Sequence, residues 1–360
     1  MLTLEAAGAG LVFDEEIGNI PDLWFGALHP LHKAPWYGEV EDLQGVPAVD
    51  RRLAGDFFCM PFGKSDIFPF PQHGYTCNGE WALIDRTEAD TRHQIRLELQ
   101  VPVMGARVQK ELRLIDGSPV LYQRHDIIGG EGQVTLAHHP MFQMAEGGRL
   151  SFSKKRVGIT PEKPLVEGRS RLAYPARSSK FTAFPGAKKS VNLHRFTDET
   201  GTDDFITLIE APGAKIGWSA LVRHAERDII FVLKEAAVLP VTMLWHSNGG
   251  REFAPWSGRH IGVLGIEDGI AAGAAGHAAA LGPNPIAAEG VKTSLTLEAK
   301  KKHVIRHAMG AVPAPSGFEE VAALELIEDR LILSSTDGAE IVVAFDPDFF
   351  RSAVPLEAGA

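Results

Sequence analysis

Apolar and polar residues alternate strictly along several segments of this chain. The pattern runs through residues 93–101 and 107–114, and residues 291–298 follow it closely. Successive side chains of a β-strand point to opposite faces of a sheet, so each segment predicts an antiparallel strand with one buried face. Clusters of glycine, proline and asparagine mark turns between such segments, at 116–119, 129–130, 147–148, 211–213 and 248–250.

Few segments favour a helix. Residues 271–281 are rich in alanine but contain glycines, so they predict a short helix at best. Residues 318–327 are the better candidate, with Ser316 placed to cap the helix N-terminus. Many short strands separated by turns predict an all-β fold, in which antiparallel sheets pack as a sandwich around one continuous core.

The composition is that of a globular protein with a large core. Of the 360 residues 44% are hydrophobic, and the net charge of -10 with no long basic run argues against nucleic acid or an anionic membrane as partner. No apolar stretch reaches the roughly 18 residues of a transmembrane helix, and the first residues lack the features of a secretory signal. Cys59 and Cys77 fit neither a disulfide framework nor a zinc spacing, which predicts a reduced, cytoplasmic protein.

Two adjacent histidines, His138 and His139, stand directly before Pro140 in a region that otherwise predicts sheet. If a strand ends here, its alternation sends the two imidazoles to opposite faces, and the proline stops the hydrogen-bond ladder. One imidazole can then lie in a cleft, where it can act as an acid or a base near neutral pH. The alternative is one buried, hydrogen-bonded histidine and one exposed histidine without any chemical role.

Glu267 follows the apolar run 261–266, which predicts a carboxylate at the end of a buried strand. Burial would raise its pKa toward the working range of a general base; the alternative is an ion-paired strand end. Tryptophans such as Trp245 and Trp256 are more often core residues, but in a cleft their flat faces would suit sugar rings.

Four short motifs occur in a characteristic order. They are Pro61-Phe62-Gly63 with a polar tail, His73-Gly74 with Trp81 downstream, His139-Pro140-Met141-Phe142, and Ile266-Glu267. In this order they resemble the aldose 1-epimerase (galactose mutarotase-like) family, over roughly residues 5 to 310. The resemblance implies a large antiparallel β-supersandwich with a sugar site in an open cleft, and an isomerase that interconverts the α and β anomers of an aldose.

The resemblance also implies roles for individual residues. His139 corresponds to the general acid of the family, Glu267 to its general base, and His73 to a histidine that contacts the sugar. Further candidates for substrate binding are Lys64, Trp245, His246 and Arg251. We expect His73, His139 and Glu267 to converge on one solvent-open cleft, with no more than about 12 Å between the last two.

The chain departs from the family pattern at two places. Lys64 and Ser65 stand where the family has an Asn-Arg pair, and an ammonium group lacks the planar fork of a guanidinium. The Gly-Tyr-Asp-His element of the galactose-converting branch is absent, and residues 245–248 occupy roughly that region. The identity of the sugar, free or phosphorylated, therefore stays open.

Mutarotation removes the proton of the anomeric O1 hydroxyl and protonates the ring oxygen O5, so one acid and one base suffice and no metal or cofactor is expected.

Two alternatives stay open: a non-catalytic sugar-binding or regulatory protein, and another carbohydrate-active enzyme, a hydrolase or lyase on the same fold. A hydrolase would need a second carboxylate across the cleft, for which the sequence offers Asp66 and Asp268.

Residues 1–313 are expected to form the sandwich domain, and residues 314–360 an extension packed on it. The extension contains the predicted helix 318–327 and two predicted strands, 330–333 and 340–345. It is too short for independent stability, so it is expected to cover a sheet edge or to form a contact within a homo-oligomer.

Overall fold

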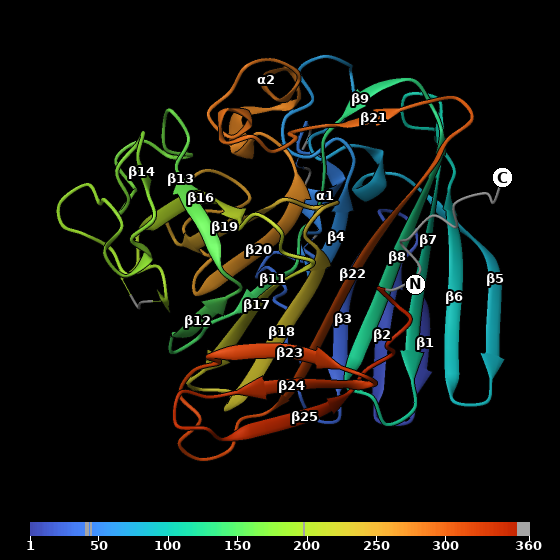
Figure 1. Ribbon diagram of the computed structural model, residues 1–360. Helices are drawn as coiled ribbons and strands as arrows, with labels where there is room; N and C mark the ends of the chain where they lie inside the picture. Colours follow the sequence, from blue (N-terminus) through green and yellow to red (C-terminus); the bar gives the residue numbers. More distant parts are fainter. Residues whose placement is uncertain (40–42, 44, 197–198, 351–360) are drawn as a thin grey trace, which may run out of the picture.

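Two large antiparallel sheets packed face to face form the body of the protein (Figure 1). The computed structural model describes residues 1–39, 43, 45–196 and 199–350. The eleven-stranded sheet contains, in spatial order, β1 (Leu2–Ala6), β2 (Ala9–Asp14), β3 (Asn19–Phe25), β4 (Asp56–Cys59), β10 (Leu136–His138), β20 (Val263–Ile270), β19 (Val241–Asn248), β16 (Thr202–Glu210), β13 (Lys155–Ile159) and β14 (Arg177–Ser178), and β11 (Met141–Gln143) also pairs with β20.

The second sheet has nine strands. In spatial order they are β15 (Arg195–Phe196), β12 (Gly148–Phe152), β17 (Ile216–Arg223), β18 (Asp228–Glu235), β22 (Lys302–Pro313), β8 (Val120–Gly129), β7 (Ala106–Ile115), β6 (Arg92–Leu99) and β5 (Trp81–Ala89). A two-stranded sheet joins β21 (Leu295–Leu297) to β9 (Gly132–Val134), and a three-stranded sheet contains β23 (Ala323–Ile327), β24 (Arg330–Ser334) and β25 (Glu340–Ala344). The predicted all-β fold is confirmed: 93–101 and 107–114 lie largely in β6 and β7, whereas only residues 295–297 of the segment 291–298 are strand.

The prediction of one continuous core is wrong, because buried apolar side chains form three clusters. The largest lies between the two sheets and includes Leu136, Ile266 and Leu264 of the first sheet and Leu121 and Ile230 of the second. Another covers the opposite face of the eleven-stranded sheet, and a third covers the opposite face of the nine-stranded sheet. Both sheets therefore bury side chains on both faces.

Helices are short and few among the described residues. α1 spans Ala48–Arg51 and α2 spans His277–Leu281, with single 3₁₀ turns at Tyr75–Cys77, Phe181–Ala183, Gly273–Ala275 and Ala287–Glu289. α2 and the β9–β21 pair lie at one end of the sandwich (Figure 1). No helix of the described part of the chain is long and apolar enough to cross a membrane.

The predicted helix at 318–327 is wrong. Residues 323–327 form β23, which pairs with β24 at Leu324 opposite Leu333. Leu324 and Leu326 lie on either side of the exposed Glu325, a spacing that suits a strand, and Leu324 is buried in the cluster that includes Leu331 and Leu333 of β24. Both predicted strands of the extension are present, as β24 and β25.

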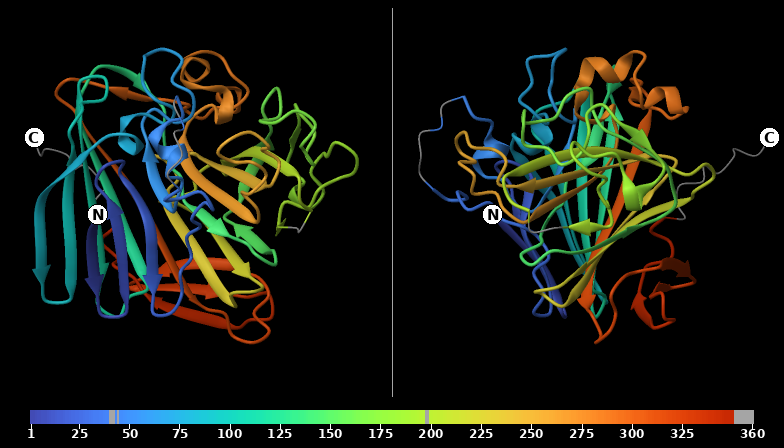
Figure 2. Two further views of the ribbon diagram at one scale, coloured as in Figure 1. Left: turned by 180° about the vertical axis from the view of Figure 1, so that it is seen from behind. Right: turned by 90° about the vertical axis from the view of Figure 1, so that its left-hand side faces the viewer.

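The three-stranded sheet lies against the nine-stranded sheet, at the end of the sandwich opposite α2 (Figures 1 and 2). Leu331, Leu333 and Val343 pack in one cluster with Tyr122 and Phe231 of the large sheet. The division of the chain at residue 313 stays a prediction, and residues 351–360 of the extension lie outside the described residues.

Leu331→Ala should lower the free energy of unfolding of the whole protein by about 2–5 kcal/mol, because it opens a cavity at a side chain with no exposed surface. Val342→Ala, on the outward face of β25 where the side chain is 55% exposed, should change it by no more than about 0.5 kcal/mol. Urea unfolding followed by far-UV circular dichroism measures both. A separate early transition for the Leu331 variant, with the main transition unchanged, would show that the extension unfolds on its own.

Candidate active site

The neighbour of β20 changes along its length from β10 to β11. The pairing register is the same on both sides of this change, and His139 and Pro140 lie in the gap. Continuing the register places His139 directly opposite Glu267. Proline has no N–H to donate, and its carbonyl accepts a hydrogen bond of 3.0 Å from the N–H of Ile266, so the ladder is only partly interrupted here.

His138 and His139 point to opposite faces of the sheet, as the alternation predicts. His138 lies between the two large sheets, where its ring stacks on His307 with centroids 4.2 Å apart. His139 lies on the outer face and stacks on Phe57 at 4.4 Å. Both rings are buried, so the alternative of one buried and one exposed histidine is wrong.

Glu267 is not at a strand end, as the apolar run had suggested, but inside β20 and opposite Met243 of β19. The apolar run misled because this strand continues through Asp268 to Ile270, and sheet neighbours on both sides keep those residues paired. Gly265, two residues earlier on the same face, leaves room for the carboxylate: a Cβ there would lie 3.2 Å from Oε1 of Glu267.

The side chains of His139 and Glu267 touch, with 3.1 Å between Nε2 and Oε1. Burial raises the pKa of Glu267 well above its usual range, against the opposing influence of Arg251. Burial also lowers the pKa of His139 to about 4. Because burial disfavours both charges, the pair near neutral pH holds one proton between a carboxyl group and an imidazole.

His73 lies beside this pair, and its ring centroid is 5.3 Å from that of His139. Its Nδ1 accepts a hydrogen bond of 3.2 Å from the N–H of Gly63, and burial lowers its pKa well below the usual value. A neutral imidazole that accepts at Nδ1 carries its proton on Nε2, so His73 is a hydrogen-bond donor at that atom. Gly74 is needed for this geometry, because a Cβ there would lie 2.0 Å from the carbonyl oxygen of Met60.

Aromatic and charged side chains from β19 and the following loop complete the pocket. The Arg251 guanidinium lies over the rings of Trp245 and Trp256, 4.8 and 4.4 Å from their centroids. Asp203 of β16 holds this arrangement: its Oδ2 accepts from Nε of Arg251 at 3.0 Å and its Oδ1 from Nε1 of Trp245 at 3.2 Å. Arg251 is therefore neutralised from behind and fixed by stacking.

These residues line a pocket of about 170 Å³ on the outer face of the eleven-stranded sheet. Of the predicted site residues it contains His73, Lys64, Arg251, Trp245, His139 and Glu267. His246 is not among its lining residues. It follows Trp245 on β19, so strand alternation sends it to the opposite face, where its ring stacks on Phe196 at 4.1 Å.

Asp50 and Asp203 are the acidic residues that sequence reasoning missed. Asp50 belongs to the short helix α1, lines the pocket, and has its pKa raised to about 6 by burial, with Arg251 opposing the rise. Nothing in the local sequence marks it. Asp203 carried a usable signal, because it and Asp204 stand as two adjacent carboxylates within the otherwise largely apolar β16.

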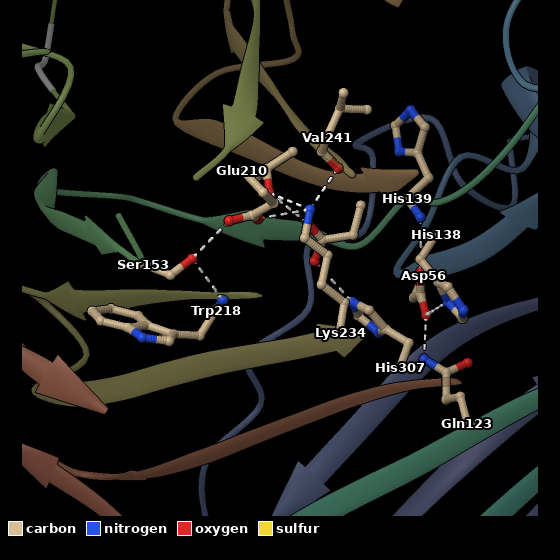
Figure 3. Close-up of polar contacts among 12 residues, drawn as sticks. Asp56, Gln123, His138, His139, Ser153, Glu210, Trp218, Lys234, Val241 and His307 are labelled. Atoms are coloured by element: carbon tan, nitrogen blue, oxygen red, sulfur yellow. Dashed lines mark hydrogen bonds and ion pairs between the residues drawn. The ribbon is translucent and has the colours of Figure 1, made fainter. Parts of the chain in front are cut away.

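A chain of buried polar side chains supports the site from the inner face of the sheet (Figure 3). Asp56 accepts hydrogen bonds from the backbone N–H of His139 at 3.2 Å and from Nε2 of Gln123 at 2.6 Å. Its carboxylate also lies 3.8 Å from Nδ1 of His138. The backbone on which His139 stands is thus tied to the second sheet.

The same chain continues beneath Glu267. Asp268, its neighbour on β20, points inward and lies 2.9 Å from Nζ of Lys234 and 3.2 Å from Nε2 of His307. Lys234 also lies 3.1 Å from Glu210, which in turn pairs with Lys155. Since these charges are paired and hydrogen-bonded, removing one partner would leave another buried without compensation.

Metal ligands are not grouped in the part of the chain that the structure describes: no set of three or more His, Cys, Asp or Glu side chains is arranged to hold an ion. Both cysteines are free and buried.

The fold is that of the galactose mutarotase-like proteins. Solved structures with this arrangement include a proposed mutarotase (YeaD) from Salmonella typhimurium, with a TM-score of 0.59 and 12% identity over 86% of this chain and 90% of that one. A proposed aldose 1-epimerase from Escherichia coli K12 has a TM-score of 0.57 and 14% identity, over 86% and 98% of the two chains. A galactose mutarotase related enzyme from Lactobacillus acidophilus has a TM-score of 0.56 and 12% identity, over 88% and 98%.

No family model matches the sequence, and no curated protein matches it. The structural likeness therefore establishes the fold, while the chemistry has to be argued from the pocket.

Glu267→Gln should change how stability depends on pH. Between its ordinary pKa of 4.5 and the raised pKa of the folded state, Glu267 stays protonated when folded but ionises when unfolded. The free energy of unfolding should therefore fall as pH rises, by up to about 1.4 kcal/mol per pH unit, and glutamine should remove this contribution. Urea unfolding at several pH values between about 5 and 8 measures it.

Glu252→Gln is the matched control, because Glu252 lies on the loop next to the pocket with a 69% exposed side chain. It should keep the pH dependence of the parent. Parallel pH profiles for the parent and Glu267→Gln would show that Glu267 ionises normally in the folded protein.

Proposed function

We propose that this protein is an aldose 1-epimerase-like isomerase that interconverts the anomers of a sugar by acid–base catalysis. The observation that supports this most directly is the contact of 3.1 Å between His139 and Glu267 in a lined pocket, with His73 beside them. The two oxygens that exchange protons in mutarotation, O1 and O5, are bonded to the same carbon. An acid and a base that serve them must therefore lie side by side, as these two groups do.

The protons balance within the pair. One member takes the proton of the O1 hydroxyl while the other gives its proton to O5, the bond between C1 and O5 breaks, and the open-chain aldehyde forms. After rotation about the C1–C2 bond, the two transfers run in reverse and close the ring as the other anomer. In the ionic form of the pair Glu267 is the base and His139 the acid; the positive charge of Arg251 favours the carboxylate of Glu267 but disfavours the imidazolium of His139.

The other lining groups suit a sugar substrate. His73 offers an Nε2–H to a ring or hydroxyl oxygen, and the faces of Trp245 and Trp256 can pack on the apolar side of a pyranose. Lys64 is exposed and contributes a positive charge at the pocket. A small-molecule aldose, free or phosphorylated, is the substrate class that we propose.

The hydrolase alternative receives little support from the residues suggested for it. Asp66 is exposed and accepts a hydrogen bond from the N–H of Ala278, and Asp268 points to the inner face. Asp50 is the second carboxylate that does line the pocket. Release of reducing sugar from aryl glycosides would reveal such an activity, and Asp50→Asn should then abolish it.

Glu267→Gln and His139→Asn should each lower the rate of anomer exchange by about 10²–10⁴-fold, because each removes a proton-transferring group while leaving a polar side chain of similar size. The double variant should lose less than the product of the two single losses, because the pair acts as a unit. Polarimetry of freshly dissolved glucose, galactose, xylose and their phosphates measures the rate, with Glu252→Gln as the control that keeps it.

The assignment fails if the parent speeds exchange and Glu267→Gln does so equally well. If the parent binds sugars by calorimetry but does not speed exchange with any of them, the protein is a sugar-binding protein on this fold.

A further inference from the structure

A second pocket lies behind the candidate active site, on the inner face of the eleven-stranded sheet. Its apolar inner cavity of about 30 Å³ is lined by His246, Phe196, Leu150, Leu244 and Leu264, among others. It adjoins a wider cavity of about 220 Å³, with which it shares four lining residues: Arg171, Val191, Asn192 and Arg195.

His246 is a buried polar side chain of the inner cavity. Its side chain is 93% buried, yet neither ring nitrogen has a hydrogen-bond partner among the described residues. Burial and the nearby Arg171 lower its pKa well below the usual value, so the ring is neutral, with one donor and one acceptor nitrogen. Buried polar groups are nearly always paired, and His246 lines a small cavity with both ring nitrogens unpaired, which indicates an absent partner.

The wider cavity is cationic. Lys188, Lys189 and Arg195 line it with exposed side chains that form no ion pair with a described acidic residue. Arg171 lines it too but is committed to Asp204, whose Oδ2 lies 2.9 Å from its Nε. Among the described residues that line this cavity, Glu199 is the one acidic side chain, so positive charge predominates in this part of the lining.

We propose that this second pocket binds a small organic anion. The carboxylate or phosphate group of this anion lies among Lys188, Lys189 and Arg195. The uncharged end of the anion bears a hydroxyl, enters the apolar cavity and hydrogen-bonds to His246. The inner cavity accepts only a group about the size of a hydroxyl or a water molecule, because its volume is a few times the minimum for one water. The apolar walls favour a short methylene stem between the two ends. This proposal is independent of the proposed mutarotation.

The two pockets lie on opposite faces of the same two strands. On β16, Asp203 faces the candidate active site and Asp204 the second pocket, and on β19 Trp245 and His246 divide in the same way. Asp203 holds Arg251 and Asp204 holds Arg171, so each pocket has its own arginine–aspartate pair. Ligands in the two pockets therefore contact different side chains and can be distinguished by them.

Histidine ring ¹⁵N NMR of the whole protein can test the proposal, with 4-hydroxybutanoate and 6-hydroxyhexanoate as probes. Either both hydroxycarboxylates or only the one of suitable length should shift the ring signals of His246, and the shift should saturate with concentration. The ring signals of His139 should not change. Butanoate, which lacks the hydroxyl, should bind about fivefold more weakly. Butane-1,4-diol, which lacks the charge, should not saturate, and inorganic phosphate should reveal how much an anionic group alone contributes.

Three variants complete the test. Arg195→Gln should weaken binding of the hydroxycarboxylates about three- to fivefold. Lys180→Gln, a matched change at an exposed cation that lines neither pocket, should leave it unchanged. His246→Phe keeps an aromatic ring against Phe196 but should abolish the preference for a hydroxyl over a methyl end, which isothermal calorimetry can follow.

The proposal is wrong if no probe moves the His246 signals, since His246 would then be paired with an ordered water only. It is also wrong if the shifts are the same in Arg195→Gln and in the parent, or if they appear at His139 and Trp245, which would place the anion in the candidate active site. Sugar isomerisation need not be present for any of these outcomes.

Discussion

The structure depends on the register between β20 and the chain that passes from β10 through His139 to β11. That register places a histidine and a glutamate opposite each other on the outer face of the sheet, where burial forces them to share one proton. Because side chains alternate along a strand, a slip of one residue would turn Glu267 inward and bring Asp268 to the pocket. The ladder bonds on both sides of the gap prevent this slip, and so they define the site.

The inner face of the same strands resists that slip as well. Asp268 is paired with Lys234 and His307, and Asp56 links the backbone of His139 to Gln123 of the second sheet (Figure 3). Moving Asp268 to the outer face would remove one of the two carboxylates that pair with the buried Lys234, which costs several kcal/mol. Apolar packing alone tolerates such slips. The polar groups between the sheets therefore specify the register more sharply than apolar packing would.

Both faces of the eleven-stranded sheet carry pockets, and this follows from the way that the sheet is covered. Loops and α1 cover its outer face, while the nine-stranded sheet covers its inner face except near the short strands β12 and β15. A large sheet with incomplete cover on each side offers two separate recesses. The one with a proton-sharing pair suits catalysis, and the one with a neutral histidine under exposed cations suits binding of an anion.

The sequence by itself determined the strand-rich fold, the opposite directions of His138 and His139, and five further pocket residues: His73, Lys64, Trp245, Arg251 and Glu267. These follow from period-2 alternation and from ordered local motifs, which are properties of neighbouring residues. Only the tertiary structure decided that Glu267 lies within its strand, that residues 323–327 form a strand, and that Asp50 reaches the site. The position of Glu267 within its strand and that of Asp50 at the site depend on segments more than a hundred residues away, which leave no trace in the local pattern, whereas 323–327 depends on the packing of its hairpin with β24 on the nine-stranded sheet.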